Sequence, residues 1–457
     1  MTTALQSTPA TAVCKRCGCV STLPKLFQKV WIGLLCPACA AKRALRYNQV
    51  IYGIALGLIL FHILGLWLLT GRPGQTGLDL LLILIFSLLL LILHELSHAA
   101  MTWLLGGRIF GIHLGVGKLL LQRWLGNFYL GVSLLPASGL CFAGFPQTSW
   151  PRLRYGLMVA AGPLFHLLLL LLLLPSTRAV LGIPGPGWLL TLFILNAFLL
   201  ALNLWPFLKV HTAVGVAGSD GNQLWRLLRG QLTAEQIHQG YYQLLATFAL
   251  QQKRDDHALA EVAQGLARYP DNQILRNLHG YLLLRSDQLA ASLTIWQALI
   301  DAPPAATIPP EQQPLIQALH YNNYAWVRLM SHSEPAHLAT AADYAERAFA
   351  MVPWLAPIRG TLAAVKVAQG DYAAGVPLAL AAAADYQQDP SPTAREGRGS
   401  NLATAALGYH RQGNAQEARR LLAEAQTLAP QEIAVRQTAA AIQNGPELVL
   451  SEHLATG

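Results

Sequence analysis

Residues 78–105 form an almost unbroken run of Leu, Ile, Phe and Ala, and His94, Glu95 and His98 lie inside it. The run is long enough to cross the ~30 Å hydrocarbon core of a bilayer as one helix, which needs about 20 apolar residues. Ionisable side chains at that depth are costly to bury and usually serve a function. Three such groups so close together need a partner, and a metal ion satisfies them at once.

The spacing of these residues is that of a HExxH motif. Residues four apart lie on one face of a helix, so His94 and His98 can offer two imidazole nitrogens to one metal ion. Glu95 is turned by about 100° from His94 and can reach the water that the metal activates. Catalytic zinc sites generally have three protein ligands and leave a fourth position for water, so a third ligand must come from elsewhere in the chain.

Asp220, in Ser219-Asp220-Gly221, is the best candidate for the third ligand. Residues 1–230 contain 17 Lys and Arg but only three acids, which are Asp79, Glu95 and Asp220. We assign Asp79 to the N-terminus of the helix that carries the motif, where a carboxylate complements the helix dipole. The alternative for Asp220 is an ordinary Asp-Gly turn, which the dipeptide favours by itself.

Composition indicates a membrane protein, because 53% of the residues are hydrophobic, 12% are charged and the mean hydropathy is +0.37. Four stretches are long and apolar enough to span a bilayer, near residues 50–70, 78–104, 155–174 and 187–205. Most cations before residue 231 precede the first span, lie between the second and third, or follow the fourth. The positive-inside rule then predicts an integral, multi-pass protein with both termini in the cytoplasm and the motif near the cytoplasmic end of its span.

Several further pieces follow the motif in order. They are Ser133-Leu134-Leu135-Pro136-Ala137-Ser138-Gly139, Ala161-Gly162-Pro163, Asn203-Leu204-Trp205-Pro206 and Asp220-Gly221. With them, residues 75–230 resemble the site-2 protease family of intramembrane zinc metalloproteases. The resemblance implies that His94, His98 and Asp220 hold one catalytic zinc ion, that Glu95 is catalytic and that Asn203 binds substrate. It also implies hydrolysis of peptide bonds in transmembrane protein substrates, which is regulated intramembrane proteolysis.

The chain departs from the family pattern in two places. The path from Asn203 to Asp220 is longer than usual, and His166 stands where an Asn commonly follows the Gly-Pro element. Residues 108–145 contain short extended segments punctuated by glycine, which predict a β-hairpin. A comparable segment lines the catalytic cleft in the family, where a substrate strand can add to its edge. The alternative is an ordinary cytoplasmic loop.

Cysteines mark a second metal site near the N-terminus. Cys14-x2-Cys17 and Cys36-x2-Cys39 are separated by 18 residues, the spacing of a four-thiolate zinc ribbon. Cys19 can compete with Cys17 as a ligand, and an iron site of similar geometry is the alternative to structural zinc. The first 47 residues carry seven cations and no acid, which favours contact with lipid headgroups over nucleic acid.

Residues 231–457 differ in residue pattern from the preceding part of the chain, because they contain amphipathic segments with helical periodicity that recur in pairs. The pattern resembles tetratricopeptide repeats. The helical segments are separated by breaks at Pro270, Pro303, Pro353, Pro390 and Pro430, and two helices start at Gly370-Asp371 and Gly413-Asn414. Such solenoids usually present a surface for a protein partner or regulator.

The predicted fold class is therefore mainly α, with three parts. A zinc-ribbon-like module covers residues 1–47, and a four-helix polytopic membrane core with a small β-hairpin covers residues 48–230. A C-terminal α-helical repeat solenoid covers residues 231–457. Two rival functions remain at this point, a catalytically inactive membrane scaffold that assembles partners through the ribbon and the repeats, and a membrane zinc transporter.

Overall fold

The computed structural model describes residues 11–23, 28–30, 33–36, 39, 73–180, 187–206, 209–212, 215–303, 313–331, 335–387 and 392–444. The chain divides into two compact units. One unit joins Met1–Ala44 to Pro270–Gly457, and the other is Leu45–Tyr269. The N-terminal segment therefore belongs with the C-terminal repeats, which the three-part division in the sequence analysis does not foresee.

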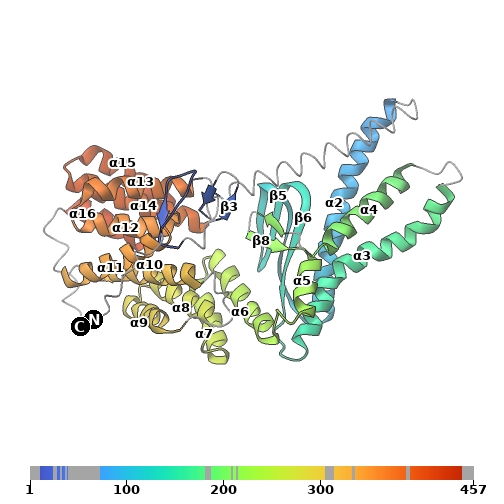
Figure 1. Cartoon of the computed structure of the whole chain (residues 1–457), viewed down its shortest axis with the longest axis horizontal. Coiled ribbons are helices and arrows are strands. Elements are labelled where there is room, and N and C mark those ends of the chain that lie inside the picture. The colour runs from blue at the N-terminus through green and yellow to red at the C-terminus, as the bar shows by residue number, and fades with distance from the viewer. Residues whose placement is uncertain are drawn as a thin grey trace, which may run out of the picture. The chain divides into compact units, whose positions relative to one another are not determined.

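Three apolar helices form the scaffold of the Leu45–Tyr269 unit, namely α2 (Pro73–Leu104), α3 (Pro151–Val180) and α4 (Gly187–Leu204). They lie side by side in Figure 1. Their Leu-rich sequences favour helix, and Pro stands at the first position of α2 and α3, where its missing N–H costs nothing.

Two helical stretches among the described residues are long and apolar enough to span a membrane, Leu81–Leu104 and Pro151–Leu174. The apolar part of α4, Leu192–Leu204, is shorter. The expected first span, residues 50–70, lies outside the described residues. The described residues thus support two candidate spans rather than the four that the sequence predicts.

The predicted hairpin between the second and third apolar segments is present, as β5 (Arg108–Leu125) and β6 (Phe128–Gly144). Its strands are bent so that His113 pairs with both Leu140 and Gly131. The register produces four segments in the order 139–144, 108–114, 129–133 and 119–125. Within the described chain, the segment 139–144 therefore has a strand partner on one side only. A second small hairpin, β7 (Lys209–Thr212) and β8 (Gly215–Gly218), fills the long path from Asn203 to Asp220.

Three helices complete this unit, namely α5 (Asp220–Leu228), α6 (Ala234–Gln251) and α7 (Asp255–Arg268). An aromatic core joins α6 to the sheet, because Phe248 lies 5.6 Å from Phe110 and 5.3 Å from Phe142 between ring centroids. His238 of α6 also donates a hydrogen bond from Nε2 to the Pro146 carbonyl at 2.9 Å. The boundary between the units thus falls after Tyr269 and not at Gly230, and of the helix pair expected to begin the repeats, α6 packs on the β5–β6 sheet and α7 packs on α6.

The other unit contains successive antiparallel helix pairs, which confirm the helical-repeat architecture. The helices are α8 (Gln273–Arg285), α9 (Leu289–Asp301), α10 (Gln313–Ser331), α11 (Pro335–Met351), α12 (Ala356–Ala368), α13 (Tyr372–Tyr386), α14 (Pro392–Arg411), α15 (Ala415–Leu428) and α16 (Ile433–Asn444). Asp371 and Asn414 accept hydrogen bonds from Ala374 N and Glu417 N and so cap α13 and α15, as their sequence predicts.

The first and last helices of this array meet. Arg285 of α8 pairs with Glu396 of α14 at 2.8 Å, and Asp287 pairs with Arg436 of α16 at 3.0 Å. The array is therefore curved within this unit until its two ends touch.

The N-terminal ribbon packs on the middle of the repeats. It contains β1 (Ala12–Val13), β2 (Val20–Ser21), β3 (Gln28–Val30) and β4 (Gly33–Leu35). Buried Cys14, Cys36 and Cys39 share one hydrophobic core with Val352 and Ile358. Ser21 Oγ donates to the Met351 carbonyl at 2.5 Å, and Thr22 N donates to the Ala350 carbonyl at 3.1 Å. The ribbon therefore contributes to the core of the repeat unit instead of standing alone.

This shared core generates a prediction about stability. Replacing the fully buried Cys36 with Ser puts a hydroxyl group, which no metal ion holds, into the core that contains Ala318 and Ile358. Burying an unpaired hydroxyl group is unfavourable, so α10 and α12 should loosen. Hydrogen–deuterium exchange of the full chain should show faster exchange in residues 313–331 and 356–368.

Cys141→Ser is the matched control, since Cys141 lies in β6 of the other unit. Unchanged exchange of α10 and α12 in Cys36→Ser would contradict a shared core.

Candidate functional site

The HExxH motif lies in the last third of α2, where His94, Glu95 and His98 are 4%, 3% and 6% exposed. His94 Nε2 and His98 Nε2 are 3.1 Å apart. His98 Nδ1 donates to the Met158 carbonyl of α3 at 2.7 Å, which fixes the ring and leaves the Nε2 lone pair directed at His94. Helical periodicity thus brings the two imidazoles together as predicted.

Asp220 reaches this pair from the N-terminus of α5. Its Oδ2 atom lies 3.1 Å from His94 Nε2 and 3.5 Å from His98 Nε2. Burial would raise the pKa of the Asp220 carboxyl, but the two adjacent histidines lower it to about 2. The long path from Asn203, which made this residue the weakest of the predicted ligands, is spanned by β7 and β8.

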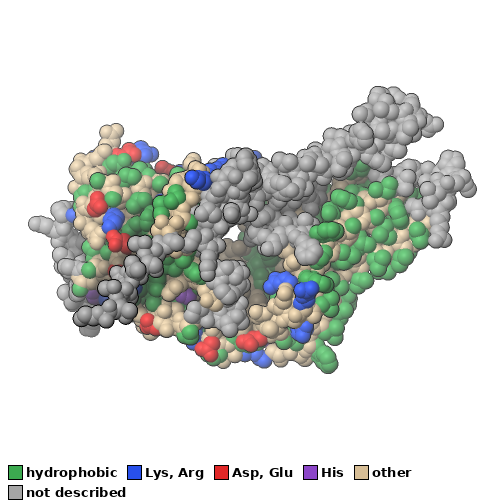
Figure 2. Space-filling model, in the orientation of Figure 1, with side chains coloured by type: hydrophobic (Ala, Val, Ile, Leu, Met, Phe, Trp, Pro, Cys, Tyr) green, Lys and Arg blue, Asp and Glu red, His purple; other side chains and the backbone are tan. Residues whose placement is uncertain are grey.

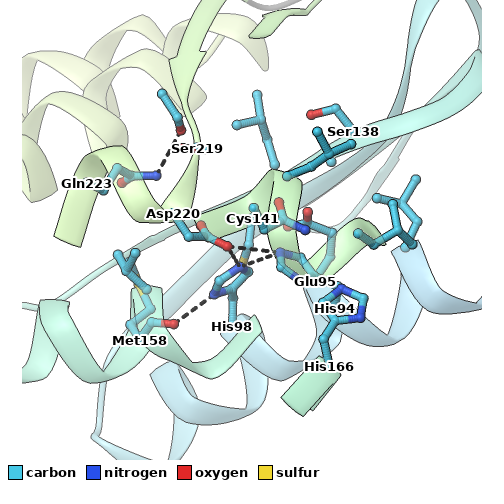
Figure 3. A pocket seen from close by; sticks show the side chains of 18 of the residues that line it. His94, Glu95, His98, Ser138, Cys141, Met158, His166, Ser219, Asp220 and Gln223 are labelled. Carbon is cyan, nitrogen blue, oxygen red and sulfur yellow. Dashed lines mark hydrogen bonds and ion pairs between the residues drawn. The ribbon is translucent and has the colours of Figure 1, made fainter. Parts of the chain in front are cut away.

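The donor atoms of His94, His98 and Asp220 all lie within 4.8 Å of one another, a geometry that can hold a metal ion (Figure 3). Within the described residues, His94 Nδ1 and Asp220 Oδ2 are buried with no hydrogen-bond partner. Nitrogen lone pairs and carboxylate oxygens that face each other repel unless a cation or proton lies between them. The donor set therefore fits a divalent metal ion.

Two glycines shape the walls around these groups. A Cβ on Gly162 of α3 would lie 2.6 Å from His94 Nε2 and from His98 Nε2. A Cβ on Gly139 of β6 would lie 2.6 Å from Cγ and Cδ of Glu95. Both glycines occur in pieces that carry the family resemblance, and the structure supplies a physical reason for each, the close approach of backbone to the reacting groups.

A cavity of about 130 Å³ surrounds the motif. Glu95 and Asn203 line it together with Ser138, Cys141, His166 and Ser219. The structure therefore places Asn203, the predicted substrate-binding residue, at the same cavity as the three metal-ion donors. It brings together every predicted residue of this site.

His166 and Asn196 form a pair beside His94 that the sequence analysis does not predict. The His166 ring centroid lies 5.0 Å from that of His94. His166 Nδ1 donates to Asn196 Oδ1 at 2.5 Å, and Asn196 Nδ2 donates back to the His166 carbonyl at 2.8 Å. A signal was present in the sequence, because Asn196 is a buried polar residue within an otherwise apolar helix. Nothing in the sequence marks the Met158 carbonyl, which is a backbone group.

The four predicted cysteines also meet. Cys14, Cys17, Cys36 and Cys39 form a second cluster whose sulfur atoms lie within 4.8 Å of one another and can hold a metal ion. Burial would raise the pKa of the Cys14 thiol, but hydrogen bonds from the backbone of Cys36, Cys17 and Arg16 lower it to about 6. Gly18 adopts a φ of +72°, the left-handed turn that the Cys17-Gly18 pair predicts. Cys19 is not in the cluster, although its thiol pKa is raised by burial and by neighbouring cysteines.

No protein-family model matches the sequence, and no curated protein matches it significantly. Two solved structures are similar to part of the chain. The first is the MamA protein, with 13% identity, a TM-score of 0.26 and coverage of 41% of this chain and 90% of that chain. The second is TTC0263, a thermophilic TPR protein of Thermus thermophilus, with 17% identity, a TM-score of 0.32 and coverage of 45% of this chain and 98% of that chain.

The close approach of Gly162 generates a prediction. Gly162→Ala should weaken metal binding at the histidines about tenfold or more, because the added methyl group would push both rings from their positions. Cobalt titration of the purified chain, with the cysteine cluster first filled with zinc, measures this affinity.

Gly240→Ala in α6 is the control, since a Cβ there would meet nothing within 4 Å. Equal cobalt affinity in the two variants would contradict the proposal that the close approach of Gly162 holds the two histidine rings in place.

Proposed function

We propose that the protein is an intramembrane zinc metalloprotease that hydrolyses peptide bonds in membrane protein substrates. The observation that carries the proposal is the convergence of His94, His98 and Asp220 beside Glu95 in one buried cavity. Two imidazole nitrogens and one carboxylate oxygen suit a catalytic zinc ion. The four-cysteine cluster suits a second, structural zinc ion.

Exposure of the apolar helices supports a place in the bilayer. Only 22% of the apolar window in α2 and 33% of that in α3 is buried. A helix from the core of a soluble protein buries most of such a window, whereas a membrane helix turns it toward lipid. The protein is thus proposed to be an integral membrane protein with the lipid bilayer as its surroundings.

Chain direction supports four crossings. The motif and Asn203 lie near the C-terminal ends of α2 and α4 and line one cavity, while Arg154 near the start of α3 donates to the Leu105 carbonyl. The three helices therefore alternate in direction and carry the chain from one membrane face to the other. Because the ribbon and the repeats share a core, the proposal includes one further crossing before α2, for which the sequence offers the apolar residues 50–70.

Glu95 is the proposed general base. When bound, zinc would polarise the scissile carbonyl and lower the pKa of the attacking water to about 7. Glu95 takes the proton from that water and delivers it to the leaving amine. The walls of the cavity around Glu95, which include Gly139 and the apolar residues of α2, limit the access of bulk water.

Substrate must leave helical form before attack, because helical hydrogen bonds occupy its carbonyls. The open edge of β6 at residues 139–144 runs past Glu95 and offers backbone groups to an extended segment. Asn203, which lines the same cavity, can hydrogen-bond the exposed substrate backbone. The repeats would recruit a protein partner or regulator, as helical solenoids generally do.

Replacing Glu95 with Gln tests the proposal. The variant should retain both zinc ions but lose cleavage by about two to four orders of magnitude, because only the base is removed. Comparing membrane proteomes of cells with the wild-type and Glu95→Gln chains should reveal uncleaved substrates, while elemental analysis measures zinc.

Cleavage by Glu95→Gln at the wild-type rate would contradict the assignment of Glu95 as the general base. Zinc flux into vesicles that is indifferent to this substitution would instead favour a transporter, and identical proteomes would favour an inactive scaffold.

The proposed topology predicts that both ends of the chain are cytoplasmic. Green fluorescent protein fused before Met1 or after Gly457 should fluoresce, since it matures only in the cytosol, and alkaline phosphatase inserted between α3 and α4 should be active outside. Phosphatase activity of a C-terminal fusion would contradict the predicted cytoplasmic C-terminus.

A further inference from the structure

Helix α5 carries the third metal-ion donor on its first residue and an exposed amphipathic surface on the rest. Asp220 and Gly221 are buried, whereas Trp225 and Leu228 are 40% and 80% exposed. Arg226 and Arg229 are exposed beside them, and the Arg229 guanidinium lies 4.3 Å from the Trp225 ring centroid. A short helix with outward Trp, Leu and Arg is typical of an element that lies in a membrane interface.

Exposed tryptophans lie at the same end of the helical scaffold. Trp103 near the end of α2, Trp150 before the start of α3 and Trp205 after the end of α4 are 71%, 74% and 60% exposed. Tryptophan is enriched where a membrane protein meets the headgroup layer, because its ring is amphipathic. Trp225 of α5 is a further exposed tryptophan, and α5 is hydrogen-bonded to the segment that follows α4.

The exposed charges on α5 itself are arginines. Arg226 and Arg229 lie in α5 and at its end, Arg152 of α3 reaches it, and Figure 2 shows Lys and Arg side chains gathered beside the apolar surface of the scaffold. Of the acids before residue 231, Glu95 and Asp220 are buried and Asp79 lies near the opposite end of α2. A surface with exposed tryptophans and exposed arginines matches anionic lipid headgroups.

Contacts at both ends of α5 connect this surface to the site. Ser219 Oγ donates to the Trp205 carbonyl at 2.6 Å, and Asn222 Nδ2 donates to the Pro206 carbonyl at 2.6 Å. At the other end, Arg152 Nη2 donates to the Leu227 carbonyl at 2.6 Å. A shift of α5 against α3 and α4 would therefore move Asp220 with respect to the two histidines.

We infer that α5 with Trp103, Trp150 and Trp205 is a docking surface for anionic lipid headgroups, and that the docked lipid holds Asp220 at the metal site. The inference rests on the proposed function for the membrane setting and the metal ion. It also sets the depth of the chemistry, since His98 precedes Trp103 by five residues on α2, a rise of about 7.5 Å. The site lies about one and a half helical turns below the headgroups, within reach of water.

Cobalt binding tests the inference without any protease assay. The full chain, with its cysteine cluster filled with zinc, is placed in phosphatidylcholine nanodiscs with or without phosphatidylglycerol. Cobalt affinity at the histidine–aspartate site should be about tenfold tighter with phosphatidylglycerol. Arg226→Gln/Arg229→Gln should remove this difference while keeping α5, because Gln is a good helix former.

Arg411→Gln/Arg419→Gln, which removes two exposed cations from the repeats, is the matched control and should keep the difference. Equal cobalt affinity of the wild type in both lipids, or a difference that persists in the α5 variant, overturns the inference. So does a neutral nanodisc in which inorganic phosphate alone restores tight binding, since the ligand would then be a free anion. Failure to bind cobalt at this site in any lipid refutes the proposed function itself.

Discussion

Mutual repulsion among three buried electron-rich atoms is the constraint on which the structure of the Leu45–Tyr269 unit depends. Two imidazole nitrogens 3.1 Å apart and a carboxylate oxygen within 3.5 Å of both are unfavourable neighbours unless a cation joins them. Three helices meet at these atoms, since α2 supplies both histidines, α3 the Met158 carbonyl that holds His98, and α5 the aspartate. A cation that relieved the repulsion would therefore also tie these helices together.

Around this centre, small residues and backbone groups matter as much as the donors. Gly162 lets α3 approach the imidazoles, and Gly139 lets the sheet edge approach Glu95. The paired Asn196 and His166 satisfy each other inside the apolar scaffold and place an aromatic ring against His94, whose own Nδ1 has no hydrogen bond within the described chain. Ring packing replaces the hydrogen bond that usually orients a metal-binding histidine.

Local periodicity was enough to predict some of this arrangement from sequence. The i, i+4 spacing predicts that His94 and His98 share a face, and the Cys-x2-Cys pairs predict a cluster, because both depend on neighbours in the chain. Asp220 could be nominated only from the scarcity of acids and from a family resemblance, since its approach depends on how β7, β8 and α5 fold. The amphipathic pattern of α6 and α7 predicts that this helix pair belongs to the repeats. The aromatic contacts of Phe248 with the sheet place the pair in the Leu45–Tyr269 unit instead. Amphipathic periodicity gives a helix its buried face but does not name the partner of that face.

The shared core of the ribbon and the repeats has a consequence for biosynthesis. Cys14 and Cys36 leave the ribosome before any apolar helix, whereas Val352 and Ile358, which complete their core, are made after all of them. Domains usually fold from the N-terminus as they emerge, but the N-terminal strands of this unit can complete their core only after the Leu45–Tyr269 unit has been synthesised. Formation of the N-terminal core therefore reports that the whole intervening unit has already been translated.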